Sequence, residues 1–263
     1  MSRGGKNGAF KLFEVVKSFS IDDRILDAII DYKFLLNRGY NRARALRIVE
    51  ERYKLNPIER MFLFRSVYSE REIVERLSKR VSLRELKGKI LLVDGFNVLI
   101  TIQSALDEDP LIICDDLFVR DLSSAFRRIK IDDKMYNALT VFLEEVKKII
   151  PYIKEIMIFY DAPVSRSGVF AQYSRRKLNE MGFKGTAVAV KRTDRAVLDM
   201  KGIISSSDSF IISKATKIVD LGGVVALRKA GLKKNIINVR RLIEEGLKRI
   251  DTKDFAKRIK KII

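Results

Sequence analysis

Lys89-Ile90-Leu91-Leu92-Val93-Asp94-Gly95-Phe96-Asn97 fixes the type of fold that this chain adopts. The apolar run from Ile90 to Val93 is typical of a short strand that is buried on both faces, as strands of parallel sheets are. Asp94 and Gly95 end this run at once. Because functional side chains collect at the carboxyl ends of strands in open parallel sheets, Asp94 is the first candidate for a functional residue.

Strand-like and helix-like segments alternate through most of the chain after this strand. Further strands are expected at 155–160, 186–190, 202–205, 224–226 and 235–237. Helices are expected at 133–149, 165–181, 194–200 and 209–221. This alternation predicts an α/β fold with a mostly parallel sheet and helices on both faces.

The residues before the strand predict an all-helical region. Helices are expected to begin near Ile25, after Asn41, at Pro57 and at Ser69, since these positions carry helical periodicity or helix-capping residues. Short helices with tight turns predict a small helix-turn-helix-like domain. We therefore expect a basic helical accessory domain at 1–86, the α/β domain at 87–228, and a basic strand-and-helix extension at 229–263 that packs on the α/β domain.

The composition limits the chemistry that the chain can perform. It has 263 residues, no His, no Trp and a single Cys. One thiol allows neither an internal disulfide nor a zinc site made of cysteines. The absence of His excludes a Ser-His-Asp triad, His-ligated zinc and imidazole acid–base catalysis. Any catalysis must therefore use carboxylates, hydroxyls or lysines.

The net charge of +19 is carried by the two ends of the chain. Residues 1–88 carry 20 Lys and Arg against 12 Asp and Glu, and residues 228–263 carry 13 against 4. Residues 89–227 are nearly balanced, with 20 against 18. Basic flanks around a neutral centre favour a polyanionic partner, and we expect nucleic acid, RNA rather than DNA. A solvated basic surface is the alternative.

The sequence predicts a cytoplasmic protein that does not enter a membrane. The N-terminal residues lack the apolar core of a signal peptide, and the apolar runs have only the length of strands. A homodimer is left open.

Acidic residues lie at the ends of several predicted strands. Asp94, Asp161 and Asp208 each come after a strand, and Asp194 begins the helix before the strand that leads to Asp208. Because the carboxyl ends of parallel strands meet at one edge of the sheet, these four carboxylates are expected to converge there. The alternative is that each acid only caps a helix or a turn.

A cluster of carboxylates is costly unless a cation lies among them, because like charges repel. Oxygen ligands without His or Cys favour Mg²⁺ or Mn²⁺ over zinc. The sequence therefore predicts a Mg²⁺ or Mn²⁺ site formed by Asp94, Asp161, Asp194 and Asp208. Such an ion activates water and shields phosphate without any need for His.

The segments around these acids resemble a known family. Leu92-Val93-Asp94-Gly95-Phe96-Asn97-Val98-Leu99 is similar to the first strand and D-G-x-N turn of the PIN-like nuclease superfamily, particularly its NYN branch. Thr193 to Leu198 and Gly202 to Phe210 resemble the paired-acid ending of that branch. The resemblance covers roughly residues 88–228. A helical domain followed by a PIN-like domain also resembles an archaeal family with no established activity.

The resemblance implies metal-dependent hydrolysis of phosphodiester bonds in RNA, and an endoribonuclease is the expected enzyme. It implies Asp94, Asp194 and Asp208 as metal ligands. It also implies Asn97 as a residue that shapes the site near water and phosphate, and Asp161 as a strand-end acid found in many relatives.

One departure from the family pattern bears on catalysis. The usual ending Ser-x-Asp-x-Asp-Phe reads Ser206-Ser207-Asp208-Ser209-Phe210-Ile211 here, so the second acid is missing. The alternative function is therefore a catalytically inactive PIN-like protein that binds RNA or DNA as a regulator.

Basic residues near the acids and in the helical domain are candidates for binding phosphate. They are Lys191, Arg192, Arg195, Arg166, Arg42 and Arg44. Guanidinium groups suit this role because they bind two phosphate oxygens at once. Solvated loops are the alternative for these positions.

Three further expectations concern residues outside the motifs. The acids at 107–109 and 115–116 are expected to form a solvated acidic loop, with an additional metal ligand as the alternative. Phe210 is expected in the core. Gly222-Gly223 is expected to end a helix before a strand.

Overall fold

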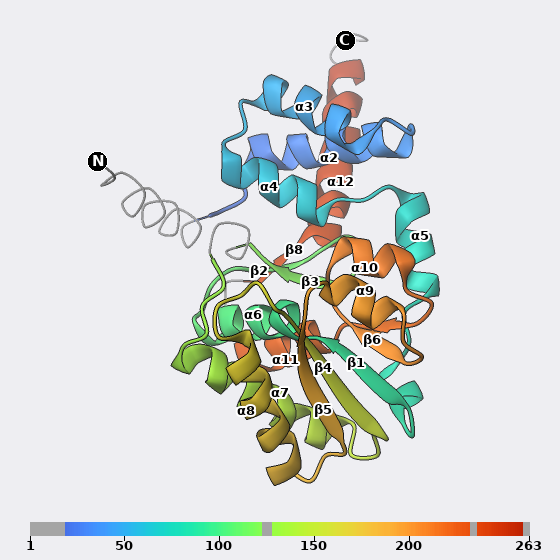
Figure 1. The fold of residues 1–263 in the computed structure, drawn as a ribbon. Coiled ribbons are helices and arrows are strands. Elements are labelled where there is room, and N and C mark those ends of the chain that lie inside the picture. The colour runs from blue at the N-terminus through green and yellow to red at the C-terminus, as the bar shows by residue number, and fades with distance from the viewer. Residues whose placement is uncertain (1–18, 123–127, 232–235, 260–263) are drawn as a thin grey trace, which may run out of the picture.

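The computed structural model describes residues 19–122, 128–231 and 236–259. Its main sheet has five parallel strands in the order β5-β4-β1-β6-β7 (Figure 1). These strands are β1 (Ile90–Asp94), β4 (Glu155–Asp161), β5 (Gly185–Val190), β6 (Ile203–Ser205) and β7 (Ile218–Val219). The predicted parallel α/β fold is confirmed.

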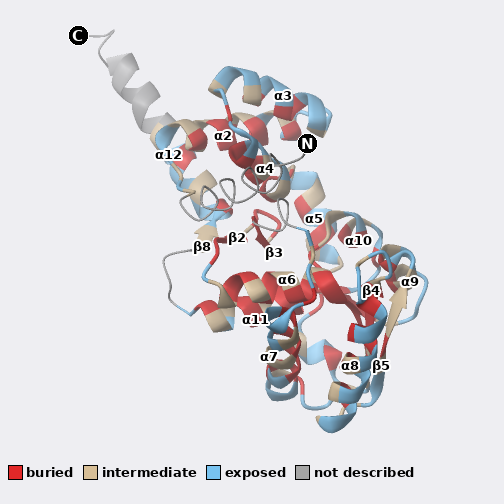
Figure 2. Cartoon of the chain, turned by 60° about the vertical axis from the view of Figure 1, so that its left-hand side comes forward, coloured by how far each residue is buried: buried red, intermediate tan, exposed pale blue. Residues whose placement is uncertain are grey.

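Each face of the sheet has its own hydrophobic core. Leu91 and Val93 of β1 pack on one face with α6 (Gly95–Leu106), α7 (Asp133–Ile149), α8 (Ser167–Glu180) and α11 (Leu221–Ala230). Leu92 packs on the other face with α9 (Thr193–Leu198) and α10 (Ser209–Lys214). The strand is apolar at successive positions because both faces are covered, and α6 is buried along most of its length (Figure 2).

The predicted helical region is present before the sheet. It consists of α2 (Asp23–Asn37), α3 (Arg42–Tyr53), α4 (Pro57–Ser66) and α5 (Glu70–Ser78). Side chains of Asn41, Asn56 and Ser69 accept hydrogen bonds from backbone N–H groups in the first turns of α3, α4 and α5. These caps explain why the sequence signals located the helix starts well.

A second, three-stranded sheet lies between the helical region and the main sheet (Figure 1). It has the order β3-β2-β8, formed by β3 (Val119–Asp121), β2 (Leu111–Ile113) and β8 (Ile236–Asn238). Neither β2 nor β3 was predicted. Ile112, Cys114 and Leu122 belong to the same hydrophobic cluster as the four helices, so this sheet joins the helical region to the rest of the chain.

The C-terminal helix α12 (Val239–Ile259) lies against α2 of the helical region (Figure 1). The two helices approach so closely that a Cβ added at Gly246 would lie 2.9 Å from the side chain of Ile30. The extension, which was expected on the α/β domain, is therefore divided: its strand β8 pairs with β2, within residues 87–228, but α12 packs on the helical region instead. Its buried first residue, Val239, belongs to the helical region's cluster, which explains the difference.

Two predicted elements near the C-terminal edge of the sheet are wrong. The segment 224–226 is part of α11 rather than a strand, and 209–221 is divided among α10, β7 and the start of α11. Gly222 and Gly223 lie in the first turn of α11, where Asp220 caps the helix by accepting the Gly223 N–H at 2.8 Å. An added Cβ at Gly222 would lie 3.2 Å from Val98 Cα, so Gly222 permits close contact with α6.

Close packing at the carboxyl end of β1 requires a glycine at position 95. An added Cβ would overlap the buried ring of Tyr160 and lie 2.7 Å from the carbonyl oxygen of Phe159. Gly95→Ala should therefore lower the free energy of unfolding by about 1–3 kcal/mol, measured by urea denaturation. Gly168→Ala is the matched control, because nothing lies within 4 Å of its added Cβ. Equal stability of the two variants would contradict this explanation.

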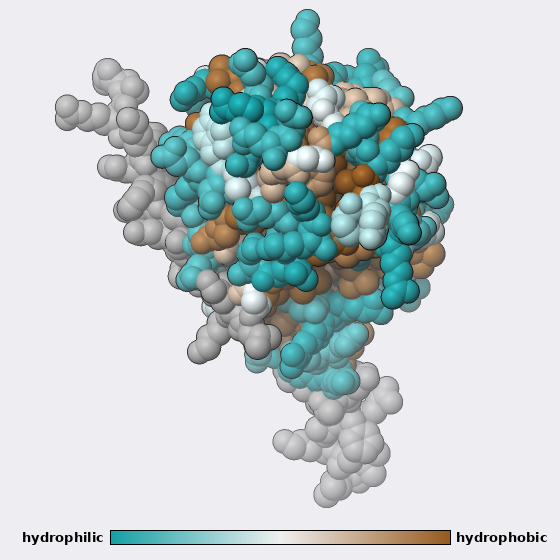
Figure 3. All heavy atoms as spheres, turned by 90° about the horizontal axis from the view of Figure 1, so that it is seen from below, coloured by the Kyte–Doolittle hydropathy of each residue, from teal (hydrophilic) through white to brown (hydrophobic). Residues whose placement is uncertain are grey.

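Hydrophilic residues cover much of the face remote from the helical region, with hydrophobic residues scattered among them (Figure 3). Single exposed apolar side chains of this kind are ordinary on protein surfaces. Over the described ranges, no helix has both the length and the apolarity needed to cross a bilayer.

Candidate active site

The carboxyl end of β1 is the point at which the order of the strands reverses. After β1 the chain adds β4 and β5 on one side, and later it adds β6 and β7 on the other side. Ligands of open α/β sheets bind in the crevice outside the strand ends at such a point. Asp94 is the last residue of β1, Asp161 ends β4, and Ser206 to Asp208 follow β6.

A cavity of about 470 Å³ opens at these strand ends. The structure brings together there all five residues that were predicted to be catalytic, namely Asp94, Asn97, Asp161, Asp194 and Asp208. Arg65 of α4 also lines the cavity. The site therefore lies between the main sheet and the helical region.

Hydrogen bonds tie the loop after β6 to the end of β1. Ser206 Oγ donates to Asp94 Oδ2 at 2.8 Å and accepts from the backbone N–H of Asp208 at 3.0 Å. Ser207 donates from its backbone nitrogen at 3.2 Å and from its Oγ at 2.8 Å to Asn97 Oδ1. The two serines therefore orient the carboxylate of Asp94 and the amide of Asn97.

The opposite side of the cavity is ordered in a similar way. Thr193 Oγ1 donates to Asp161 Oδ1 at 2.7 Å, which joins the start of α9 to the end of β4. Arg192 Nη2 lies 3.2 Å from Asp194 Oδ2, and this hydrogen bond lowers the pKa of Asp194. Both residues of that pair are solvent-accessible, so the pair contributes little to stability.

Asp94 is buried, whereas the other three acids are partly exposed. Burial, together with the charges of Asp208, Asp161 and Asp194, raises the pKa of Asp94 from the ordinary 3.8 to about 7, even though the hydrogen bond from Ser206 acts in the opposite direction. Only 6% of the residue is exposed. At pH 7 the carboxyl of Asp94 is therefore only partly ionised, because burial and the neighbouring acids destabilise its charged form.

Asp208 also has a structural role at this site. Its Oδ1 accepts the backbone N–H groups of Phe210 at 2.9 Å and Ile211 at 3.0 Å, which caps α10. Asp208 therefore does cap a helix, as the alternative interpretation of the sequence expected. It does not exclude a second role, since a carboxylate has two oxygens and about four lone-pair sites.

Asp121 and Phe210 line the cavity although neither was predicted there. Asp121 at the end of β3 is 3% exposed and adds a fifth carboxylate to the lining. Its segment matched no motif, so no sequence signal pointed to it. Phe210 was expected in the core but is 51% exposed and lines the cavity, because the second residue of α10 faces the crevice.

The donor set suits Mg²⁺ or Mn²⁺ in its chemistry, because it consists of carboxylate and amide oxygens. Within the part of the chain that the structure describes, no three Asp, Glu or Cys side chains form a ready-made group of metal ligands. Mg²⁺ usually keeps several waters and binds through one or two carboxylates and substrate phosphates, so it does not need such a group. A cation would also offset the repulsion around Asp94.

The basic candidates fall into two groups. Arg166, Lys191, Arg192, Arg195 and Arg44 are exposed. Arg42 is instead used inside the helical region, where its Nη2 donates to the carbonyl oxygens of Phe64 and Val67 and its guanidinium lies 4.3 Å from the ring centroid of Tyr68. These contacts of Arg42 therefore stabilise the end of α4 and the loop that follows it.

Two family models match the chain. The model described as Domain of unknown function (DUF5616) matches residues 83–224, and the model described as Protein of unknown function (DUF434) matches residues 24–79. An uncharacterized protein of Methanocaldococcus jannaschii is 35% identical over 193 residues, which make up 73% of this chain and 91% of that protein. No solved structure matches the chain significantly. The first family match contains all five predicted catalytic residues.

Proposed function

We propose that this chain, which belongs to the family described as Domain of unknown function (DUF5616), is a Mg²⁺- or Mn²⁺-dependent ribonuclease that hydrolyses phosphodiester bonds in RNA. The observation that carries the proposal is the meeting of Asp94, Asp161, Asp194 and Asp208 at one cavity, with Asp94 buried beside the other three charges. Carboxylates so arranged repel one another, and a bound divalent cation relieves that repulsion.

The chain's own residues have separate tasks in this proposal. Asp94, Asp161 and Asp208 would hold the cation, which supplies a reactive water near neutral pH and shields the phosphate. Ser206 and Thr193 keep two of these carboxylates in place through the hydrogen bonds described above. Asn97 uses its carbonyl oxygen for Ser207, so its amide group remains the donor toward water or phosphate.

Asp121 supports retained catalysis despite the departure from the PIN-like pattern. Phe210 stands at the position of the absent second acid, and it lines the cavity. Asp121 brings a carboxylate to the same cavity from β3. We assign to it the part of the missing acid, although it comes from a different segment of the chain.

The exposed basic residues support an RNA substrate. Lys191 and Arg195 flank Asp194, and Arg166 follows β4. These residues would bind the backbone phosphates near the site, while the basic ends of the chain add affinity that falls with salt. We place the proposed activity in the cytoplasm, as the sequence predicts.

Asp208→Asn should lower the rate of RNA cleavage in Mn²⁺ by about 100-fold or more, because it removes a charged ligand. Asn is as good an N-cap as Asp, so α10 and the fold should be unchanged. Asp199→Asn is the matched control, since Asp199 is exposed and does not line the cavity. It should keep its rate within about twofold.

The alternative, a PIN-like protein that binds nucleic acid without cutting it, makes a different prediction. It expects wild-type protein to retain RNA in a gel-shift experiment but to leave it intact in Mg²⁺ and Mn²⁺. If wild-type protein cleaves RNA and Asp208→Asn lowers the rate no more than Asp199→Asn does, the assignment of this site is contradicted.

A further inference from the structure

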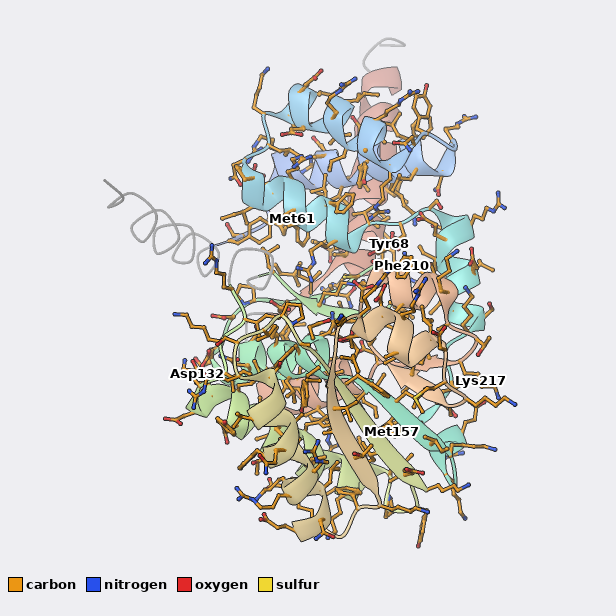
Figure 4. The ribbon with its side chains drawn as sticks, viewed as in Figure 1. Met61, Tyr68, Asp132, Met157, Phe210 and Lys217 are labelled. Carbon is orange, nitrogen blue, oxygen red and sulfur yellow. The ribbon has the colours of Figure 1, made fainter. Side chains whose placement is uncertain are left out.

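The loop that carries Asp208 is held from outside the main sheet as well as from within it. Arg120 Nε donates to the carbonyl oxygen of Ser207 at 2.9 Å, and Arg120 lies on β3 of the second sheet. Tyr68 Oη lies 2.9 Å from Ser209 Oγ, and Tyr68 lies between α4 and α5 of the helical region. Figure 4 shows Tyr68 and Phe210 where the helical region meets the main sheet.

Arg120 is fixed by a buried ionic network. It is 2% exposed, and its Nη1 and Nη2 each donate at 2.9 Å to one oxygen of Asp116, which is fully buried. Arg76 of α5 donates to the same carboxylate at 2.8 Å. The helical region is thereby connected through Asp116 to Arg120 and to the carbonyl of Ser207.

Tyr68 forms a second connection with a defined direction. Its hydroxyl donates to the carbonyl oxygen of Arg65 at 2.8 Å, so the contact with Ser209 must use the hydroxyl hydrogen of Ser209. Tyr68 is 1% exposed, and its ring centroid lies 3.9 Å from the guanidinium group of Arg76 and 4.3 Å from that of Arg42. The ring therefore has little freedom to move.

We infer that Tyr68 and Arg120 are positioning residues, and that through them the helical region sets the place of the loop from Ser206 to Ser209. Ser206 orients Asp94, Ser207 orients Asn97, and Asp208 is itself a member of the site. A small displacement of this loop moves all three at once, and reactive geometry tolerates little displacement. The helical region therefore helps to position the residues of the site.

The inference rests on the proposed function only for the chemical activity of the site. The positioning of the loop can be tested first, without metal or RNA. Tyr68→Phe and Ser209→Ala each remove the hydrogen bond between Tyr68 and Ser209 without leaving a large cavity, and Tyr68→Phe also removes the bond to the carbonyl oxygen of Arg65. In metal-free protein, the backbone amides of Phe210 and Ile211 should then exchange with D₂O about fivefold faster by NMR, the effect of losing roughly 1 kcal/mol of local stability. The double variant should exchange no faster than the faster single variant, within a factor of about two.

The control is Tyr53→Phe, which also removes a tyrosine hydroxyl hydrogen bond in the helical region. Tyr53 Oη donates to Asp31 Oδ2 at 2.7 Å, away from the loop. This variant should leave the exchange of Phe210 and Ile211 unchanged. Equal exchange in Tyr68→Phe and Tyr53→Phe, or additive effects in the double variant, would overturn the inference.

A second measurement links the loop to the metal site. Tyr68→Phe and Ser209→Ala should weaken Mn²⁺ binding by about tenfold in calorimetry and lower kcat for RNA cleavage, with KM changed less than about twofold. Faster amide exchange without any Mn²⁺ binding or cleavage by the wild type would refute the proposed function and leave the positioning of the loop established. Unchanged exchange with wild-type cleavage would refute the positioning alone.

Discussion

Replacing Asp94 with Asn is expected to lower metal-dependent RNA cleavage by at least about 10³-fold and, at the same time, to stabilise the metal-free protein above pH 7. The two effects have one cause. Asp94 is buried beside three other carboxylates, so its charge is useful for a cation and costly without one. Asn has the same shape and its carbonyl oxygen accepts the hydrogen bond from Ser206, but it carries no charge.

The direction of the pH dependence follows from the pKa of Asp94. Its value in the folded chain, about 7, lies above the ordinary 3.8, so the folded protein holds a proton that the unfolded chain releases. Stability from this group is fully present below pH 3.8 and is lost as the pH rises through 7. Above pH 7 the loss reaches about 4 kcal/mol, and Asp94→Asn avoids it.

Thermal unfolding with EDTA at pH 5 and pH 8 measures this effect. Asp94→Asn should melt higher than wild-type protein at pH 8, with a much smaller difference at pH 5. Mn²⁺ should reverse the order at pH 8, because only the wild type gains stability from the cation. A variant that melts lower than wild type at both pH values without metal would contradict the electrostatic account of this residue.

Removing Asp116 is expected to produce the largest loss of stability among the acids of the second sheet. Burial alone would raise its pKa, but the charge and hydrogen bonds of Arg120, together with the charge of Arg76, lower the pKa below its ordinary value. Asp116→Ala leaves two buried guanidinium groups without their shared partner. The free energy of unfolding should fall by about 3–5 kcal/mol, as it does when one member of a buried ion pair is lost.

Urea denaturation checks this prediction, with Glu51→Ala as the control. Glu51 also pairs with an arginine, but its contact with Arg47 is 3.9 Å long and both side chains are more than 70% exposed. Its loss should cost less than about 1 kcal/mol. Similar losses for the two variants would show that the network around Asp116 is not the structural connection described here.

The parallel sheet and the convergence of the acids were predictable because both depend on local patterns. The apolar run at Ile90–Val93 specifies a strand buried on both faces, and an acid at the end of such a strand must lie at the edge of the sheet. Asp94, Asp161 and Asp208 follow this rule. No knowledge of distant contacts was needed to bring them to one cavity.

The second sheet and its acids were not predictable, because their partners lie far away in the sequence. Asp115 and Asp116 were expected in a solvated loop, yet both are buried, and their cationic partners include Lys33 and Arg76 in the helical region. Neighbouring residues give no sign of such pairing. Asp121 was missed for the same reason, since it reaches the cavity only through the fold of its short strand.

Arg42 shows that a basic composition does not reveal the role of an individual arginine. Its position in a basic, helical segment favoured a role in binding phosphate. The structure instead surrounds its guanidinium with the rings of Tyr68 and Phe64 and with backbone carbonyls at the end of α4. A charge count gives the sign of a surface but does not separate the arginines that face solvent from those that hold helices together.

The most direct test of the carboxylate site is the fate of a 5′-labelled single-stranded RNA incubated with wild-type protein in Mn²⁺, in Mg²⁺ and in EDTA. We expect cutting in the presence of either metal, none in EDTA, and none by Asp94→Asn in any condition. An RNA that stays intact with both metals while the protein still binds it, or one that is cut equally well by Asp94→Asn, would contradict the assignment of this site as a metal-dependent ribonuclease.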